Sequence, residues 1–115
     1  LEVDAYLLVA ALYALQASGS GESRGARDKT SFGGSARWLR REMGVGQESL
    51  DRRFGALLEA RRSDLPHRLR QIVTLMSTRA VGVRYDQLLR DVTAWDDGRD
   101  VQRRWARDYW AGASS

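Results

Sequence analysis

The chain opens with a run of hydrophobic residues, from Tyr6 to Leu15, that is apolar around its whole circumference when drawn as a helix. The run predicts a helix over residues 3–16, and a helix of this kind is expected to be buried on all sides. It is too short to cross a membrane, which needs about 20 apolar residues. Because the sequence starts at Leu1 and not at methionine, we expect either that preceding residues are absent or that a partner covers this helix.

Five further segments carry apolar residues at helical spacing and are separated by short polar connections. They are predicted over residues 35–43, 48–62, 64–78, 85–95 and 101–110. The capping residues expected are Ser35 for the helix at 35–43, Ser63 or Asp64 for the helix at 64–78 and Asp100 for the helix at 101–110. No segment alternates apolar and polar residues for long enough to form a strand. The pattern therefore predicts an all-α fold, a compact bundle of five to six short helices.

A stretch rich in glycine and serine, residues 17–34, separates the first predicted helix from the others and holds five of the eleven glycines. We interpret it as a linker or loop. The chain then divides into an apolar helix at 1–16, this linker, and a basic helical bundle at 35–115. The apolar helix is expected to pack on the bundle or on an absent N-terminal part.

The composition excludes several kinds of chemistry. The 115 residues fit one domain with one modest core. Without cysteine the chain has no disulfide, no thiolate nucleophile and no cysteine-based metal site. His67 is the single histidine, and a lone histidine on a polar helix face is usually solvated. We therefore expect no catalytic residue, no metal site and no cofactor, and, without a signal peptide or long apolar run, a cytoplasmic protein.

The basic residues are distributed unevenly. The formal net charge is +4, yet residues 1–22 carry three acids and no base, whereas residues 23–115 carry all 19 basic residues. A basic body of this kind suggests a polyanionic partner. Eighteen of the 19 are arginine, a bias that a GC-rich genome also produces, so the placement of the arginines is more informative than their number.

The last predicted helix places arginines beside aromatic residues. One half of its wheel holds Val101, Trp105, Ala106, Tyr109 and Trp110, and the other half holds Arg103, Arg104 and Arg107. Guanidinium groups beside large aromatic rings suit phosphate contact and base stacking. An amphipathic helix with an aromatic core face and solvated arginines is the alternative interpretation.

A second cluster consists of Arg37, Arg40 and Arg41, which share one face of the helix predicted at 35–43. Guanidinium groups at this spacing repel one another unless an anion lies over them. A phosphate contact and a simple solvated face both remain open. Trp38 is expected to project away from this cluster.

Three more arginines lie beside apolar stripes. Arg53 flanks the apolar stripe of the helix predicted at 48–62. Arg68 and Arg70 flank the stripe of the helix predicted at 64–78 from opposite sides, about 160° apart on the helical wheel. We therefore expect at least one of these two to form a structural ion pair, with Glu59 or Asp64 as its partner.

Five segments follow one another in an informative order and spacing. They are Tyr6–Leu15, Arg53–Ala60, Arg68–Val73, Tyr85–Val92 and Val101–Tyr109. Each is a common helical pattern, but together they resemble CasB, the small subunit of the type I-E CRISPR surveillance complex, Cascade. The resemblance covers most of the chain outside residues 17–34. The sequence departs from the family in lacking its N-terminal helices and in a linker unusually rich in glycine and serine.

The resemblance implies an all-helical, non-catalytic protein that acts inside a larger complex, while a separate helicase-nuclease cuts the DNA. The implied partners are the guide RNA, the target and displaced DNA strands, the backbone and large subunits of Cascade, and a second copy of the chain, with no membrane. The residues that match implied nucleic-acid contacts are Arg53, Arg68, Arg70, Arg104 and Arg107. Arg37 matches less closely, and Arg40 and Arg41 rest on the helical wheel alone.

We therefore expect a subunit that stabilises the R-loop through arginine–phosphate contacts and does not read sequence. The second interpretation is a helical adaptor whose arginines meet acidic protein surfaces, and it predicts little salt-dependent DNA binding. A helix-turn-helix regulator would need a short turn and a recognition helix, which the pattern does not contain. An enzyme comes last, because histidine, cysteine and paired carboxylates are lacking in a suitable setting.

Overall fold

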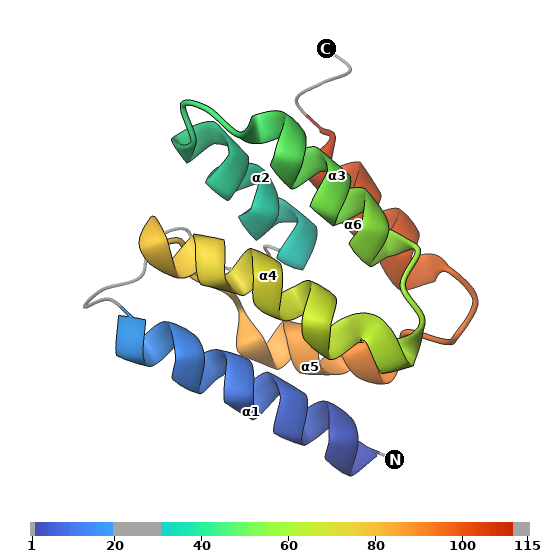
Figure 1. Cartoon of the computed structure of the whole chain (residues 1–115). Coiled ribbons are helices and arrows are strands. Elements are labelled where there is room, and N and C mark those ends of the chain that lie inside the picture. The colour runs from blue at the N-terminus through green and yellow to red at the C-terminus, as the bar shows by residue number, and fades with distance from the viewer. Residues whose placement is uncertain (1, 20–30, 112–115) are drawn as a thin grey trace.

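Six α-helices joined by short connections make up the fold, seen in a computed structural model that describes residues 2–19 and 31–111 (Figure 1). The helices are α1 (Glu2–Gly19), α2 (Phe32–Glu42), α3 (Gln47–Leu58), α4 (Leu65–Thr78), α5 (Tyr85–Thr93) and α6 (Asp100–Tyr109), and a 3-10 turn, η1 (Arg62–Asp64), precedes α4. No β-strand forms among these residues. The prediction of an all-α bundle of short helices is confirmed.

Helix α4 lies at the centre of the bundle. It packs against α1 on one side and against α2 and α3 on the other, while α5 packs on α1, and α6 packs on α2 (Figure 1). The apolar stripe of α4 is fully buried, as its spacing predicts, and consists of Leu65, Leu69, Ile72, Val73 and Met76. The polar side of α4 is therefore left to face outward beside α3.

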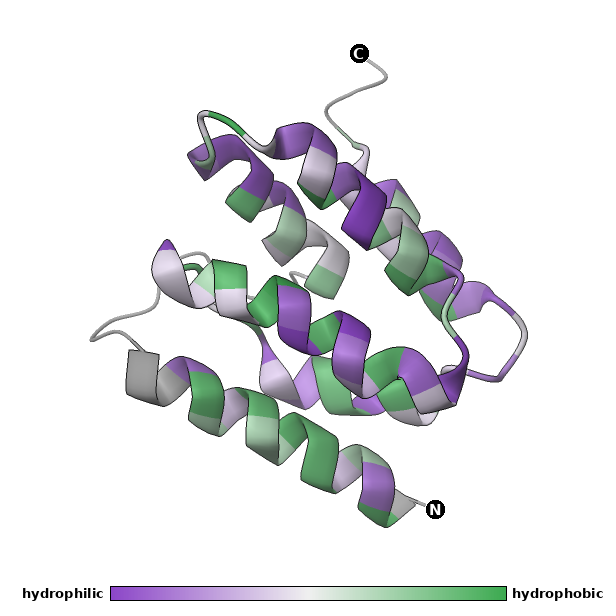
Figure 2. Cartoon of the chain, in the orientation of Figure 1, coloured by the Kyte–Doolittle hydropathy of each residue, from purple (hydrophilic) through white to green (hydrophobic). Residues whose placement is uncertain are grey.

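Helix α1 is hydrophobic on its outer face as well as its inner one (Figure 2). Its inner residues pack against α4 and α5, but four large side chains are 60–65% exposed, namely Val3, Tyr6, Leu7 and Tyr13. Helices α4 and α5 cover only the inner face of α1 within the described part of the chain. That absent residues or a partner cover its outer face stays a prediction. No helix in that part is both long enough and apolar enough to cross a membrane.

Helix α2 begins three residues earlier than the sequence predicts. The Ser31 hydroxyl accepts a hydrogen bond of 3.1 Å from the Gly34 N–H and donates one of 2.6 Å to Asp108 in α6, so Ser31 is the N-cap. Ser35, the predicted cap, is buried inside the helix. The prediction was wrong here because the partner that fixes Ser31 comes from a helix distant in sequence.

The linker predicted at 17–34 is shorter than expected. Helix α1 continues to Gly19 and α2 begins at Phe32, which leaves residues 20–31 between them. Of these, residues 20–30 lie outside the part of the chain that the structure describes.

Other helix ends differ from the prediction by a few residues. Helix α3 ends at Leu58 rather than at residue 62, and α5 ends at Thr93 rather than at residue 95. Asp64 occupies the N-cap position of α4 but makes no side-chain capping bond. Asp100 is the first residue inside α6 rather than its cap. Both carboxylates still lie near N–H groups at helix starts, where negative charge is favourable.

The contact between α2 and α6 depends on a glycine. A Cβ atom at Gly33 would lie 2.8 Å from the Cα and C atoms of Trp105, which is closer than two such atoms can approach. The same contact brings the Phe32 and Trp105 rings within 5.1 Å, and the Trp95 and Trp105 rings lie 5.2 Å apart. This aromatic cluster fixes the rotation of α6 and thereby the direction in which its arginines point.

Candidate nucleic-acid interface

The eight arginines predicted as nucleic-acid contacts are spread over four helices. Helix α2 carries Arg37, Arg40 and Arg41, α3 carries Arg53, α4 carries Arg68 and Arg70, and α6 carries Arg104 and Arg107. Within residues 2–19 and 31–111 they fall into two groups. Arg40 and Arg104 form short ion pairs and Arg107 a longer one, whereas the other five form none. An unpaired guanidinium has its donors available for an outside anion.

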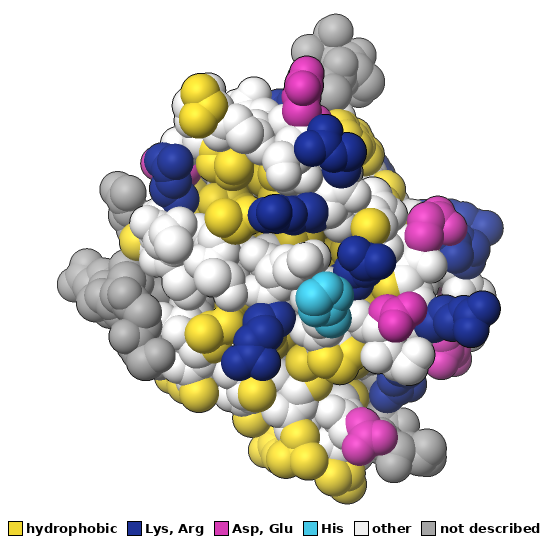
Figure 3. Space-filling view, viewed as in Figure 1, with side chains coloured by type: hydrophobic (Ala, Val, Ile, Leu, Met, Phe, Trp, Pro, Cys, Tyr) yellow, Lys and Arg dark blue, Asp and Glu magenta, His cyan; other side chains and the backbone are white. Residues whose placement is uncertain are grey.

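Arg53 of α3 and Arg70 of α4 both line a shallow groove between these two helices. The groove has a volume of about 360 Å³ and is lined by Arg53, His67, Arg70, Gln71, Thr74 and Leu75. Figure 3 shows this face of the molecule, with basic side chains around the histidine and an acidic side chain beside it. No carboxylate is among the residues that line the groove itself, where the structure brings together two of the predicted arginines.

Arg68 lies away from this groove and is partly buried. The expected ion pair of Arg68 or Arg70 with Glu59 or Asp64 does not occur among the described residues. Glu59 pairs instead with Arg99 at 3.4 Å. The helical wheel predicts that Arg68 and Arg70 lie on opposite sides of α4. In agreement with this, Arg70 lines the groove and Arg68 does not.

Arg40 is held by an acidic partner on the neighbouring helix. Its Nε and Nη2 atoms donate hydrogen bonds of 2.8 and 3.1 Å to the two oxygens of Asp51 in α3, and the Tyr109 hydroxyl donates to the same carboxylate at 2.6 Å. The Arg40 hydrogen bond holds the pKa of Asp51 below its ordinary value, with a further contribution from Tyr109. Burial and the bond to Asp51 raise the pKa of Tyr109. This cluster ties α2, α3 and α6 together.

Arg104 is held in a similar way by Asp91 of α5, whose side chain is only 3% exposed. Two guanidinium nitrogens donate to one Asp91 oxygen, and the Trp105 indole donates to the other. Gln87 adds a further bond at 3.0 Å. A buried carboxylate needs partners of this kind, so Arg104 has a structural role at the contact of α5 with α6.

Arg41 lies over the ring of Trp38, with 5.7 Å between its guanidinium carbon and the ring centroid. The expectation that Trp38 projects away from the arginine cluster of α2 is therefore wrong. Residues three apart on a helix are neighbours, and a cation over an aromatic face is favourable. Arg37 is partly buried and forms no ion pair with the described part of the chain.

Of the three predicted contact arginines that form ion pairs, Arg107 on α6 is the most exposed, with 74% of its side chain open to solvent. Its Nε atom lies 3.5 Å from the carboxylate of the neighbouring Asp108. An exposed ion pair at this distance contributes little to stability. Its guanidinium is therefore available to an external anion.

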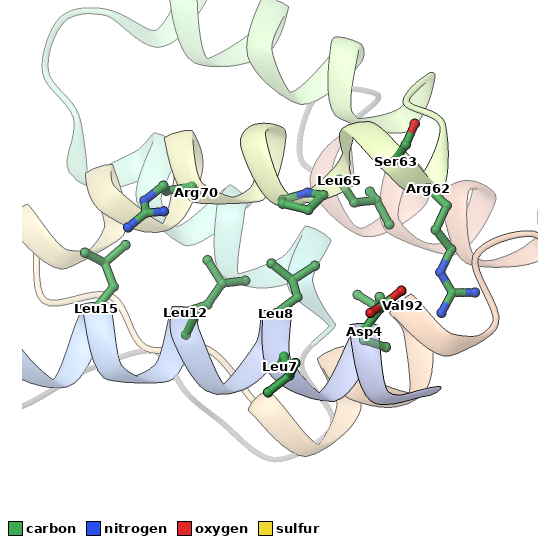
Figure 4. Close-up of a pocket in the computed structure, with 13 residues that line it drawn as sticks. Asp4, Leu7, Leu8, Leu12, Leu15, Arg62, Ser63, Leu65, Arg70 and Val92 are labelled. Carbon is green, nitrogen blue, oxygen red and sulfur yellow. The ribbon is translucent and has the colours of Figure 1, made fainter. Parts of the chain in front are cut away.

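A second hollow, of about 760 Å³, lies between α1 and α4 (Figure 4). Its floor is apolar, with Leu8, Leu12 and Leu15 of α1 pointing toward α4, and its charged rim residues are Asp4, Arg62 and Arg70. An apolar floor does not solvate phosphate, so this hollow does not resemble a seat for a polyanion. It adds to the exposed apolar surface of α1.

The described residues include no group of three or more histidine, cysteine, aspartate or glutamate side chains that could hold a metal ion. The chemistry available on the α3–α4 face is instead hydrogen-bond donation and positive charge. That chemistry binds anions.

Sequence reasoning missed two functionally relevant features. The first is that Asp51 pairs with Arg40 and Asp91 pairs with Arg104. In the sequence, the only indication of these pairs is that each aspartate stands beside the apolar stripe of a predicted helix. The second is that His67 shares a groove with Arg53 and Arg70. The helical wheel places His67 on the same face as Arg70, but the approach of α3 to that face is a tertiary contact.

Comparison with known proteins gives a consistent result. A family model described as CRISPR-associated protein Cse2 matches residues 2–110. The CRISPR-associated protein Cse2 of Thermus thermophilus is 42% identical in an alignment of 115 positions that covers 98% of this chain and 60% of that protein.

Two crystal structures are also similar. M. ruber CasB matches with a TM-score of 0.79 and 29% identity, over 98% of this chain and 65% of that chain. CasB from Thermus thermophilus matches with a TM-score of 0.72 and 37% identity, over 96% and 63% of the two chains. The chain thus spans 60–65% of the length of these relatives.

Proposed function

The chain belongs to the CRISPR-associated Cse2 family, the CasB small subunit of type I-E Cascade, and we propose that it binds nucleic acid within such a complex. In this role it is a non-catalytic subunit. It stabilises the guide RNA–target DNA duplex and the displaced DNA strand through contacts between arginines and phosphates. The contacts do not depend on base sequence.

The observation that carries this proposal is the groove between α3 and α4. Arg53 and Arg70 share it, no acidic side chain lines it, and neither arginine is paired within the described residues. Like charges so placed repel one another, and a polyanion relieves the repulsion. The open Arg107 and the α2 cluster of Arg37 and Arg41 extend the available positive charge.

Modest contacts are sufficient for this role. The RNA–DNA duplex formed in an R-loop is about as stable as the DNA duplex it replaces, so a small gain from protein–backbone contacts shifts the balance. Phosphate contacts position the protein on the nucleic acid and carry no sequence information. The guide RNA therefore supplies specificity, and this chain supplies stabilisation.

The proposed partners are the guide RNA and both DNA strands, together with the backbone and large subunits of Cascade and a second copy of the chain. The exposed apolar residues of α1 offer surface of the kind found in protein interfaces. The complex acts in the cytoplasm.

Fluorescence anisotropy with labelled single-stranded and duplex oligonucleotides, across a salt series, tests the proposal. We expect binding that is independent of sequence and weakens as salt rises. Each phosphate contact should contribute about 0.7 to the slope of log K against log salt for single strands and about 0.9 for duplex. The Arg53→Ala/Arg70→Ala variant should bind more weakly and show a slope shallower by about 1.4 for single strands.

The matched control is Arg90→Ala/Arg99→Ala. It removes the same charge, but from arginines that pair with Asp86 and Glu59. Its affinity should stay near that of the unchanged protein. No binding even at low salt would refute the proposal for this chain, and equal losses in the two variants would indicate a general charge effect.

A helical protein adaptor is the second candidate function, and the exposed apolar side chains of α1 favour it. In that case the arginines meet acidic surfaces of protein partners. The same titration separates the candidates, because an adaptor should show little salt-dependent DNA binding.

A further inference from the structure

The polar face of α4 carries a regular row of hydrogen-bonding side chains that the proposed function does not yet use. His67, Arg70, Gln71 and Thr74 stand at positions i, i+3, i+4 and i+7, which places them on one side of the helix. All four line the groove that Arg53 of α3 closes from the opposite side. The row is therefore aimed at one place rather than dispersed over the surface.

Among the residues that the structure describes, these five side chains have no polar partner. None of Arg53, His67, Arg70, Gln71 and Thr74 forms a side-chain hydrogen bond or ion pair with another residue in 2–19 or 31–111. Two guanidinium groups, an imidazole, a carboxamide and a hydroxyl can all donate hydrogen bonds. Hydrogen-bond donors from two helices thus line the groove, and no carboxylate is among the lining residues.

The donors suit a phosphodiester group better than a base. Guanidinium groups match the oxygens of phosphate in a two-pronged geometry, and neutral hydroxyl and amide donors complete its hydrogen bonds. No phenylalanine, tyrosine or tryptophan lines the groove, and the His67 imidazole and the two guanidinium planes are the only lining groups that can stack on a base. Leu75, the remaining lining residue, is apolar and partly buried.

We propose that this groove is a seat for the sugar–phosphate backbone of a nucleic acid, in which His67, Gln71 and Thr74 bind phosphate together with Arg53 and Arg70. The inference rests on the proposed function and deepens it, because it names the site and adds three contacts. The groove recognises the backbone and is indifferent to base identity.

The decisive variant is Gln71→Ala/Thr74→Ala, because it leaves the net charge unchanged. The affinity for a labelled single-stranded oligonucleotide of mixed sequence should fall about 5-fold, the loss expected for one to two hydrogen bonds to phosphate. The salt slope should not change, since no charged contact is removed. An abasic oligonucleotide of the same length should show the same fold-loss. The control is Ser63→Ala/Thr93→Ala, which removes two hydroxyls outside the groove and should bind normally.

A second variant, His67→Glu, places a carboxylate in the groove and should weaken binding at least 10-fold. The substitution lies in the first turn of α4, where negative charge is favourable, so the variant should stay folded. Circular dichroism checks that each variant is folded.

The outcomes separate this inference from the proposed function. Normal binding by both groove variants, beside salt-dependent binding by the unchanged protein, would overturn the groove and leave the function standing. A loss seen with the mixed-sequence oligonucleotide and absent with the abasic one would mean that the groove contacts bases. Groove variants that lose binding to polyglutamate but keep binding to DNA would show that it takes an acidic protein. Each of these results contradicts a backbone seat.

Discussion

The Arg104 guanidinium donates two hydrogen bonds, of 3.1 and 2.9 Å, to a single oxygen of the buried Asp91 carboxylate. The other oxygen accepts the indole N–H of Trp105 at 2.9 Å, and Trp105 itself is fully buried. An arginine whose position suggests a nucleic-acid contact is thus also part of the contact between α5 and α6. Effects of its removal on binding and on folding must be measured separately.

Arg104→Ala should lower the free energy of unfolding by about 1.5–3 kcal/mol, the range for a hydrogen bond to a charged group. Asp91 keeps its bonds from Trp105 and Gln87, so the loss is partial. Urea denaturation measures the change. Arg103→Ala on the same helix, whose side chain is 75% exposed, should change the stability by less than about 0.5 kcal/mol. Equal effects of the two substitutions would contradict the structural role of Arg104.

Gly33→Ala should destabilise the protein by about 1–3 kcal/mol, because the new methyl group would meet the backbone of Trp105 and separate α2 from α6. Gly55→Ala is the matched control. Its Cβ would meet nothing within 4 Å, and alanine in a helix interior should raise the stability by about 0.5–1 kcal/mol. Thermal unfolding of the two variants should give shifts of opposite sign. A neutral Gly33→Ala would show that the two helices can move apart without cost.

Asp51 should make stability depend on pH in the acid range. Its pKa is lower in the folded protein than its ordinary value of 3.8, so its ionised form stabilises the fold above that value. This contribution is lost as the pH falls below 3.8 and through the folded-state pKa. Asp51→Asn should therefore be less stable than the unchanged protein at neutral pH, and the difference should shrink under acid conditions.

Urea denaturation at pH about 7, 5 and 3 measures this difference. Asp97→Asn, which changes an exposed carboxylate without an ion pair in the described residues, should show no such trend. A stability difference for Asp51→Asn that stays constant with pH would mean that the carboxylate charge does not matter.

The sequence predicts the helices of the bundle well because the apolar spacing that identifies a helix lies within that helix. The spacing of Leu65, Leu69, Ile72, Val73 and Met76 is sufficient to identify α4 and its buried face. The helix starts were less accurate, since Ser31 is fixed by Asp108 from a distant helix. The same limit applies to the site. A helical wheel places His67 and Arg70 on one face, but the approach of Arg53 and the capture of Arg40 by Asp51 are contacts between helices.

The exposure of α1 has the same origin. A hydrophobic run predicts burial, but whether a helix is covered on both faces depends on what surrounds it. Only α4 and α5 cover α1 in the described residues, and Tyr6 and Leu7 stay exposed. The local pattern therefore predicted the helix, whereas what covers its outer face stays a prediction.

Comparing Arg107 with Arg103 tests whether nucleic-acid binding by α6 depends on the position of an arginine or only on the net charge of the helix. Arg107 and Arg103 both lie on α6, are 74% and 75% exposed, and each has only a 3.5 Å contact with a nearby aspartate. Arg107→Ala should leave the unfolding free energy within about 0.5 kcal/mol. It should also weaken nucleic-acid binding and make the salt slope shallower by about 0.7 for single strands or 0.9 for duplex.

Arg103→Ala removes the same charge at a neighbouring position and should bind nearly normally. Anisotropy titrations of the two variants across salt measure the difference directly. A shared loss would mean that α6 contributes only its overall charge. A loss confined to Arg107→Ala would place one phosphate contact at that residue, because exposure, helix and net charge are the same in both variants.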